Sequence, residues 1–217
     1  MATKCSSFRQ KNPGKSGTGK CTVNIMRIYL YILLFSLGLI SCSGNGNYSP
    51  KPRGYFRIEF PEKSYRQFQS DAPFTFEYPL YAAMYPDSSK ESRKNWYNLT
   101  FPDFNARLHI SYYNFSNQKE LEQLTEDSRK LAFKHTIKAT GIDEAIIRNQ
   151  KKKVYGIYYT IEGNTASLLQ FYLTDSTKHY LRGALYFNEK PKFDSVQPVA
   201  HLIKQDLDKM IMTFKWK

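Results

Sequence analysis

The chain has little cysteine, with only Cys5, Cys21 and Cys42 among its 217 residues. So few cysteines exclude a domain built on a disulfide framework. The roughly 165 residues after Cys42 are enough to bury a hydrophobic core without bridges. Sites that need several cysteine ligands for a metal are excluded for the same reason.

The sequence also lacks a membrane-spanning run at its start. The apolar stretch of residues 28–40 has about 13 residues, whereas a spanning helix needs about 20. Its length is that of a signal-peptide core, and Arg27 supplies the positive flank. Leu39-Ile40-Ser41-Cys42 resembles a bacterial lipobox, in which cleavage precedes a cysteine whose thiol carries acyl chains such as palmitate. A buried core helix is the alternative interpretation of this stretch.

We therefore predict that residues 1–41 are a removed signal peptide and that Cys42 is the lipidated first residue of the mature protein. Met26 directly precedes Arg27, and a start there would give a signal peptide of ordinary length. Met26 is thus the alternative start of the chain.

No acidic residue occurs in residues 1–41, and this changes how the charge is interpreted. The formal net charge of +13 and the aromatic content of 16% suggest a nucleic-acid binder at first. The signal peptide carries six cations, however, so its removal lowers the net charge to +7. A lipoprotein lies away from most nucleic acid, so we predict no nucleic-acid partner and favour anionic lipid, glycan or an acidic protein.

Residues 42–53 show no apolar periodicity and predict a lipidated tether. Pro50 and Pro52 stiffen its far half, and about ten extended residues reach at most about 33 Å. Residues 43–46 contain no acidic cluster of the kind that directs lipoproteins to the cell surface, which favours a location facing the periplasm. Either membrane is compatible with the sequence.

Residues 54–217 predict a single domain of class α+β, with a mostly antiparallel sheet and two amphipathic helices packed on it. Alternating apolar and polar residues predict the strands. The predicted strands are 55–60, 74–78, 96–101, 105–113, 154–161, 166–173 and 179–187. We expect 96–101 and 105–113 to form a hairpin, and the last three strands to form a meander.

Two segments have helical periodicity. The first begins at a capping box of Asn117 and Glu120, and Gly141 is positioned to end it. The second is capped by Asp194 or Ser195, with Pro198 in its first turn. Its apolar stripe is Val196, Val199, Ile203, Leu207, Met210 and Phe214.

Three long blocks of the sequence, 48–58, 125–135 and 166–188, resemble the gliding-motility lipoprotein GldD family of the Bacteroidetes. The resemblance covers essentially the whole mature chain. It implies a lipoprotein that is needed for surface gliding and associated with the type IX secretion machinery. It provides no catalytic residues, so Cys42 is the only functional position that transfers.

The residues themselves do not predict an enzyme. The four histidines are dispersed and none has metal-ligand spacing. Asp175, Ser176 and His179 fall within one turn, where we expect their side chains to bond the local backbone rather than form a triad. We therefore predict no enzymatic activity, no metal and no cofactor.

The strands contain more tyrosine than a small core needs, and tyrosine is enriched at interfaces. Tyr180, Arg182 and Tyr186 share one face of the last strand, and we predict that this face docks an envelope protein. The alternative is that a helix covers it. For the whole chain we predict a membrane-anchored, non-enzymatic accessory or assembly component of gliding motility and type IX secretion. The alternative is a periplasmic module that binds lipid or glycan.

Overall fold

The computed structural model describes residues 29, 31, 58–188 and 193–217. The chain divides into two units, Met1–Gly54 and Tyr55–Lys217. Cys42, the predicted tether and all of the predicted signal peptide except residues 29 and 31 lie outside the described residues, as does the first half of the predicted strand 55–60. Its described residues, 58–60, are not in a strand.

The folded unit contains a seven-stranded antiparallel sheet and two long helices, so the predicted α+β class is confirmed. The strands of this sheet, in spatial order, are β4 (Ala83–Pro86), β5 (Tyr97–Phe101), β6 (Ala106–Asn114), β10 (His179–Phe187), β9 (Ser167–Thr174), β8 (Val154–Gly163) and β7 (Ala139–Asn149). Two small sheets pair β1 (Tyr65–Gln67) with β3 (Glu77–Pro79) and β2 (Phe74–Thr75) with β11 (Lys215–Trp216). The helical elements are η1 (Pro102–Phe104), α2 (Gln118–Phe133), η2 (Lys134–Ile137) and α3 (Phe193–Thr213).

The hairpin β5–β6 and the meander β8–β9–β10 form as predicted. One glycine shows how closely these strands pack. A Cβ on Gly156 would lie 1.8 Å from the backbone oxygen of Tyr172, so only glycine fits there. The predicted strand 74–78 is interrupted and forms the short strands β2 and β3.

Helix α2 begins as predicted, because the Asn117 side chain accepts a hydrogen bond from the Glu120 backbone N–H at 3.0 Å. Its predicted end at Gly141 is wrong. The helix ends at Phe133, η2 follows, and Gly141 lies in β7, a strand that the sequence pattern did not predict. The meander therefore has four strands rather than three. Helix α3 also begins earlier than predicted, so Pro198 lies inside it.

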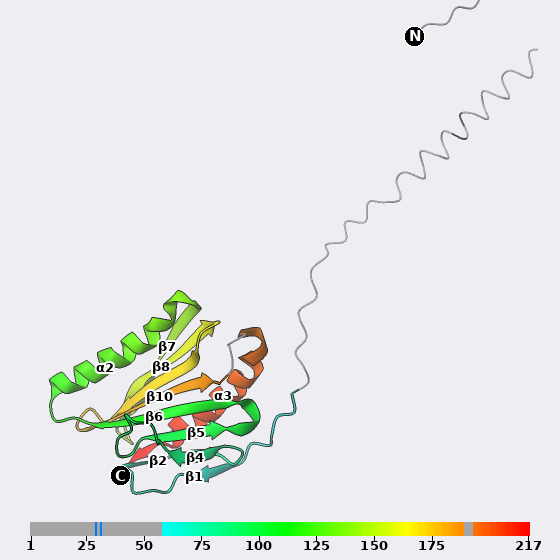
Figure 1. The fold of residues 1–217 in the computed structure, drawn as a ribbon. Helices are drawn as coiled ribbons and strands as arrows, with labels where there is room; N and C mark the ends of the chain where they lie inside the picture. The colour runs from blue at the N-terminus through cyan, green and yellow to red at the C-terminus, as the bar shows by residue number, and fades with distance from the viewer. Residues whose placement is uncertain (1–28, 30, 32–57, 189–192) are drawn as a thin grey trace, which may run out of the picture. The chain divides into compact units, whose positions relative to one another are not determined.

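The two helices pack on opposite faces of the sheet (Figure 1). On one face, Leu173 and Leu181 pack with the stripe of α3, which contains Ile203, Leu207 and Met210. On the other face, the alternate residues of the same strands pack with Leu121 and Ala132 of α2. Because successive strand residues point to opposite sides, the two cores are separated by the sheet.

The segment that precedes β4 also packs into the α3 core. Phe68, Phe74 and Phe76 stack on one another, and Phe74 and Phe76 stack on Phe214. Asp206 of α3 is 1% exposed. Its carboxylate accepts hydrogen bonds from Lys63 at 3.0 Å and from Tyr65 at 2.8 Å, and another from the hydroxyl of Tyr81. A buried charge is tolerated only when it is paired in this way, so Asp206 pins the segment to the helix.

Candidate functional site

The α2 face of the sheet is only partly covered by the helix. Tyr159, Tyr172 and Tyr180 pack beneath α2. Toward β6, the same face carries polar side chains instead. We call Arg107, His109, Gln170, Arg182 and Tyr186 the basic face. Strand register shows that they share one side of the sheet. Arg107 lies opposite Tyr186, and His109 lies opposite Ala184. Arg182, Ala184 and Tyr186 alternate along β10, so they point to the same side.

The structure separates the three residues of the predicted docking surface. Tyr180 is 1% exposed and lies beneath α2. Its hydroxyl donates to the Leu124 carbonyl at 3.1 Å and accepts from the Ser128 hydroxyl at 2.7 Å, and its ring stacks on Tyr172. Burial raises its pKa above the ordinary tyrosine value. Tyr180 therefore anchors the helix, whereas Arg182 and Tyr186 are half-buried on the uncovered part of the face.

Several donors on the basic face lack an acceptor. Arg182 donates to the Gln170 side-chain oxygen at 2.6 Å. The other end of that amide, Gln170 Nε2, is buried with no partner, and so is Arg107 Nε. Among the described residues, no carboxylate lies within ion-pair distance of either arginine. Buried donors of this kind favour an added acceptor, because an unmade hydrogen bond is unfavourable.

The two arginines also act on the neighbouring histidines. Burial lowers the pKa of His109, and the charges of Arg107 and Arg182 lower it further, against a smaller opposing effect of Asp87. Burial and Arg182 lower the pKa of His135. Both rings are therefore neutral at neutral pH, and the positive charge of this face comes from the arginines.

A hollow beside Arg182 extends the basic face beneath α2. Its volume is about 400 Å³. Leu124 and Leu131 supply apolar walls, while Lys130 and Lys134 join Arg182 at the lining. The carboxylate of Asp127 also lines the hollow, and Lys130 is paired with Glu126 at 3.7 Å. The hollow therefore combines apolar walls with charges of both signs, and its cations outnumber its carboxylates.

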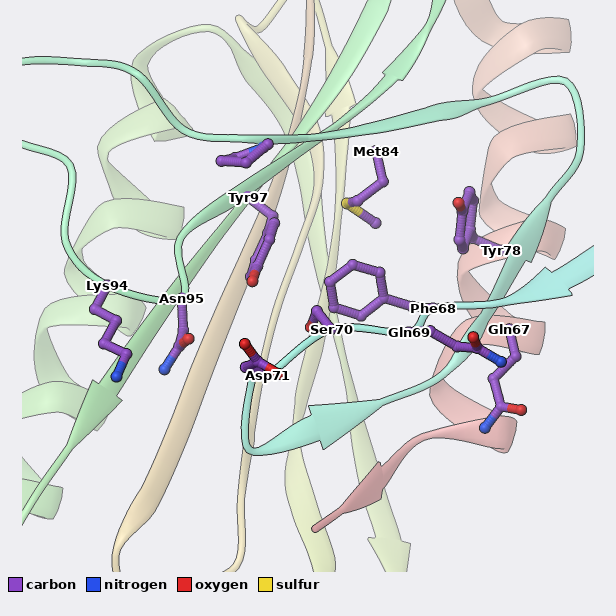
Figure 2. Close-up of a pocket in the computed structure, with 11 residues that line it drawn as sticks. Gln67, Phe68, Gln69, Ser70, Asp71, Tyr78, Met84, Lys94, Asn95 and Tyr97 are labelled. Atoms are coloured by element: carbon purple, nitrogen blue, oxygen red, sulfur yellow. The ribbon is translucent and has the colours of Figure 1, made fainter.

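A second cavity, with a volume of about 740 Å³, is lined by residues 67–71 together with residues of β3, β4 and β5. Figure 2 shows Phe68 at its centre, with Tyr97, Met84 and Tyr78 around the ring. Phe68 and Tyr97 meet edge to face at 4.9 Å. Most of the remaining lining residues carry amides or charges: Gln67, Gln69, Asp71, Lys94 and Asn95.

In the turn of Asp175, Ser176 and His179, the predicted bonding of side chains to the local backbone is confirmed for Asp175. One oxygen of Asp175 accepts three backbone N–H groups, those of Thr177, Lys178 and His179, each at 2.9 Å. His179 instead contacts the Tyr112 hydroxyl at 2.6 Å through Nδ1. Within the part of the chain that the structure describes, there is no group of acidic, histidine or cysteine side chains that could hold a metal ion.

Sequence reasoning missed Arg107, His109 and Gln170. A signal for the first two existed, because Ala106, Leu108 and Ile110 alternate with Arg107, His109 and Ser111 along β6. This pattern predicts that one face of the strand lacks an apolar cover. Gln170 stands within an otherwise apolar run of β9. No alternation of apolar and polar residues marks it, so the sequence pattern does not predict its place on this face.

Comparison with known proteins gives one family. The family model described as gliding motility lipoprotein GldD matches residues 45–216, which begin three residues after Cys42. A search of the curated proteins finds no match. Among solved structures, the chain is similar to the solution structure of cyanobacterial PsbP (CyanoP) from Synechocystis sp. PCC 6803. The identity is 10% and the TM-score 0.45, and the similarity covers 75% of this chain and 98% of that chain.

No helix among the described residues is long and apolar enough to span a bilayer.

Proposed function

This chain belongs to the gliding motility lipoprotein GldD family, and from this premise we propose that it is a non-enzymatic accessory or assembly component of gliding motility and of the associated type IX secretion machinery. The observation that carries the proposal is the family match, which covers residues 45–216 and begins three residues after Cys42. The protein acts by position: it holds one folded domain beside the membrane and presents it to a protein of the envelope machinery.

Cys42 supplies the membrane attachment in this proposal. Two or three acyl chains give stable anchoring, whereas one chain alone gives marginal binding. The tether of residues 42–53 keeps the domain within about 33 Å of the bilayer. The absence of acidic residues at 43–46 supports a periplasmic orientation.

The basic face supplies the protein contact. Arg107 and Arg182 have no acidic partner among the described residues, and each arginine is a strong donor to a carboxylate. Tyr186 adds apolar area next to His109, with ring centroids 5.5 Å apart. An acidic segment of an envelope protein fits this combination of charge and aromatic surface. Tyr180 takes no part because α2 covers it.

Gliding and secretion assays in cells test both parts. We expect Cys42→Ala to release the protein from the membrane and to abolish gliding. We expect Arg107→Glu with Arg182→Glu to leave the protein in the membrane at its normal level but to abolish gliding. The control reverses two exposed lysines, Lys90→Glu with Lys151→Glu, and keeps the change of charge equal. Normal gliding and secretion by the arginine variant would contradict docking at the basic face.

The cavity in Figure 2 supports one second candidate, the binding of a glycan. Its volume is within the range of ligand sites, about 300–1,000 Å³. Its mixture of aromatic rings and amides suits a polyhydroxylated ligand better than an acyl chain, because both apolar and hydrogen-bonding groups converge there. Titration with envelope glycan fragments, with Tyr97→Ala as the binding-site variant, tests this function. No binding by the unaltered protein removes it.

A further inference from the structure

Strand β7 stands at one end of the seven-stranded sheet and is eleven residues long. In the described part of the chain it pairs only with β8. Its other edge therefore presents backbone N–H and C=O groups that can pair with another strand. Helix α2 packs mainly against β9 and β10, and residues 143–146 of β7 are exposed, so this part of the edge is open.

The side chains of β7 form a symmetric pattern about Ile146. Glu144, Ile146 and Arg148 lie opposite Tyr159, Ile157 and Tyr155 of β8, so they share one face of the sheet. All three are exposed, and Ile146 is 84% exposed. The strand thus carries a negative charge, an apolar side chain and a positive charge at equal spacing.

We propose that β7 pairs with β7 of a second copy of this chain, antiparallel, with Ile146 opposite the partner's Ile146. A two-fold axis perpendicular to the sheet then places Glu144 opposite the partner's Arg148, and Arg148 opposite the partner's Glu144. The interface is isologous, because the same residues serve both subunits. The sheet becomes continuous across the two copies.

Charge complementarity selects this register among those that a two-fold axis allows. Centring the pair on Glu144 would place two like charges directly opposite each other, which is destabilising. Centring it on Ala145 or Ile147 would place Ile146 opposite a charged residue, Glu144 or Arg148. Only the register centred on Ile146 makes two opposite-charge pairs and buries the exposed isoleucine against itself.

The opposite face of β7 and the length of the overlap agree with this register. Ala145 would lie opposite the partner's Ile147, so the second face also gains an apolar pair. The paired segment runs from residue 143 to residue 149. This segment is separated from η2 by the first four residues of β7, so η2 does not obstruct the second copy.

Disulfide cross-linking in membranes tests the register, because the mature chain has no cysteine other than Cys42, whose thiol is acylated under the proposed function. Residues directly opposite in an antiparallel pair have Cα atoms about 4.5–5.5 Å apart, within the range of a disulfide. We expect Ile146→Cys to give a disulfide-linked homodimer after mild oxidation. Asp143→Cys is the matched control. Its mate would lie six residues farther along the strand, about 20 Å away, so it should give no dimer.

Charge exchange tests the choice of partner. In the Ile146→Cys background, we expect Glu144→Arg to reduce the homodimer about tenfold, because both opposite-charge pairs become like-charge pairs. Adding Arg148→Glu should restore the homodimer. The melting temperature of each variant shows that the fold itself is unchanged. Absence of an Ile146→Cys homodimer, a cross-link to a different protein instead, or failure of the double exchange to restore the dimer would each overturn the proposal. Loss of the dimer with gliding intact would leave the proposed function standing, so the two failures are distinguishable.

Discussion

The two faces of the sheet are closed in different ways. The α3 face is sealed by the helix and by the segment that precedes β4, and its large side chains are mostly phenylalanine, leucine and isoleucine. The α2 face is covered over only part of its width, and its core depends on tyrosines whose hydroxyls need partners. This difference suggests a division of roles. The α3 face provides stability, and the α2 face is able to accept another molecule where the helix stops.

The largest effect should come from a cavity in the α3 face. Phe171 of β9 is buried there, and its ring packs over Gly183 of β10. We expect Phe171→Ala to lower the free energy of unfolding by about 4 kcal/mol, from lost burial and an unfilled cavity. Urea unfolding measures this change. Tyr186→Ala on the uncovered part of the other face is the control, and it should lower the free energy by about 1 kcal/mol or less. Equal effects would contradict the proposed division of roles.

A smaller effect should follow from removal of Asp206, the only Asp, Glu, Lys or Arg that is buried among the described residues. Asp206→Ala leaves the donors of Lys63, Tyr65 and Tyr81 without their acceptor. We expect a loss of about 2 kcal/mol, since donors that lose a buried partner are unfavourable. Asp206→Asn keeps an acceptor oxygen and should lose less. If Asp206→Ala unfolds at the same urea concentration as the unaltered protein, this carboxylate does not stabilise the contact between the N-terminal segment and α3.

The attachment of α2 should be weaker than either of these contacts. Tyr180→Phe keeps the ring and removes the hydroxyl that bonds Ser128 and Leu124. We expect a loss of about 1 kcal/mol. Amide hydrogen exchange should show faster exchange in α2 and unchanged exchange in α3, because the contact is local. Faster exchange in both helices would mean that the two faces are not independent.

The sequence predicted those elements whose pattern is local. The meander of β8, β9 and β10 follows from alternation and from the turn at residues 162–164, and α2 begins at the predicted Asn117 cap. Strand β7 was missed because Asp143, Glu144, Ala145 and Ile146 are all exposed, so no alternation of buried and exposed residues marks it. Its extended form depends on pairing with β8, which is a tertiary contact.

The candidate site was predictable to the same extent. A period of two places Tyr180, Arg182 and Tyr186 on one face of β10, and the register confirms that arrangement. Where α2 stops along that face is set by the packing of Leu121 and Ala132 on Tyr159 and Tyr172, which are distant in sequence. The burial of Tyr180 and the exposure of its neighbours therefore required the fold.

The smallest effect concerns the turn between β9 and β10, at the end of the sheet. Partial burial acts to raise the pKa of Asp175, but hydrogen bonds from the Thr177 hydroxyl and three backbone N–H groups outweigh it and lower the pKa to about 2 from its ordinary value of 3.8. A carboxylate with a lowered pKa in the folded state adds stability above the ordinary pKa, and that stability is lost as the pH falls from about 4 to about 2. Asp175→Asn should remove this part of the acid sensitivity. Unfolding measured at pH 6 and at pH 3 checks it, and the difference between the two values should be smaller in the variant. An unchanged difference would show that the stability of the turn does not depend on the charge of Asp175.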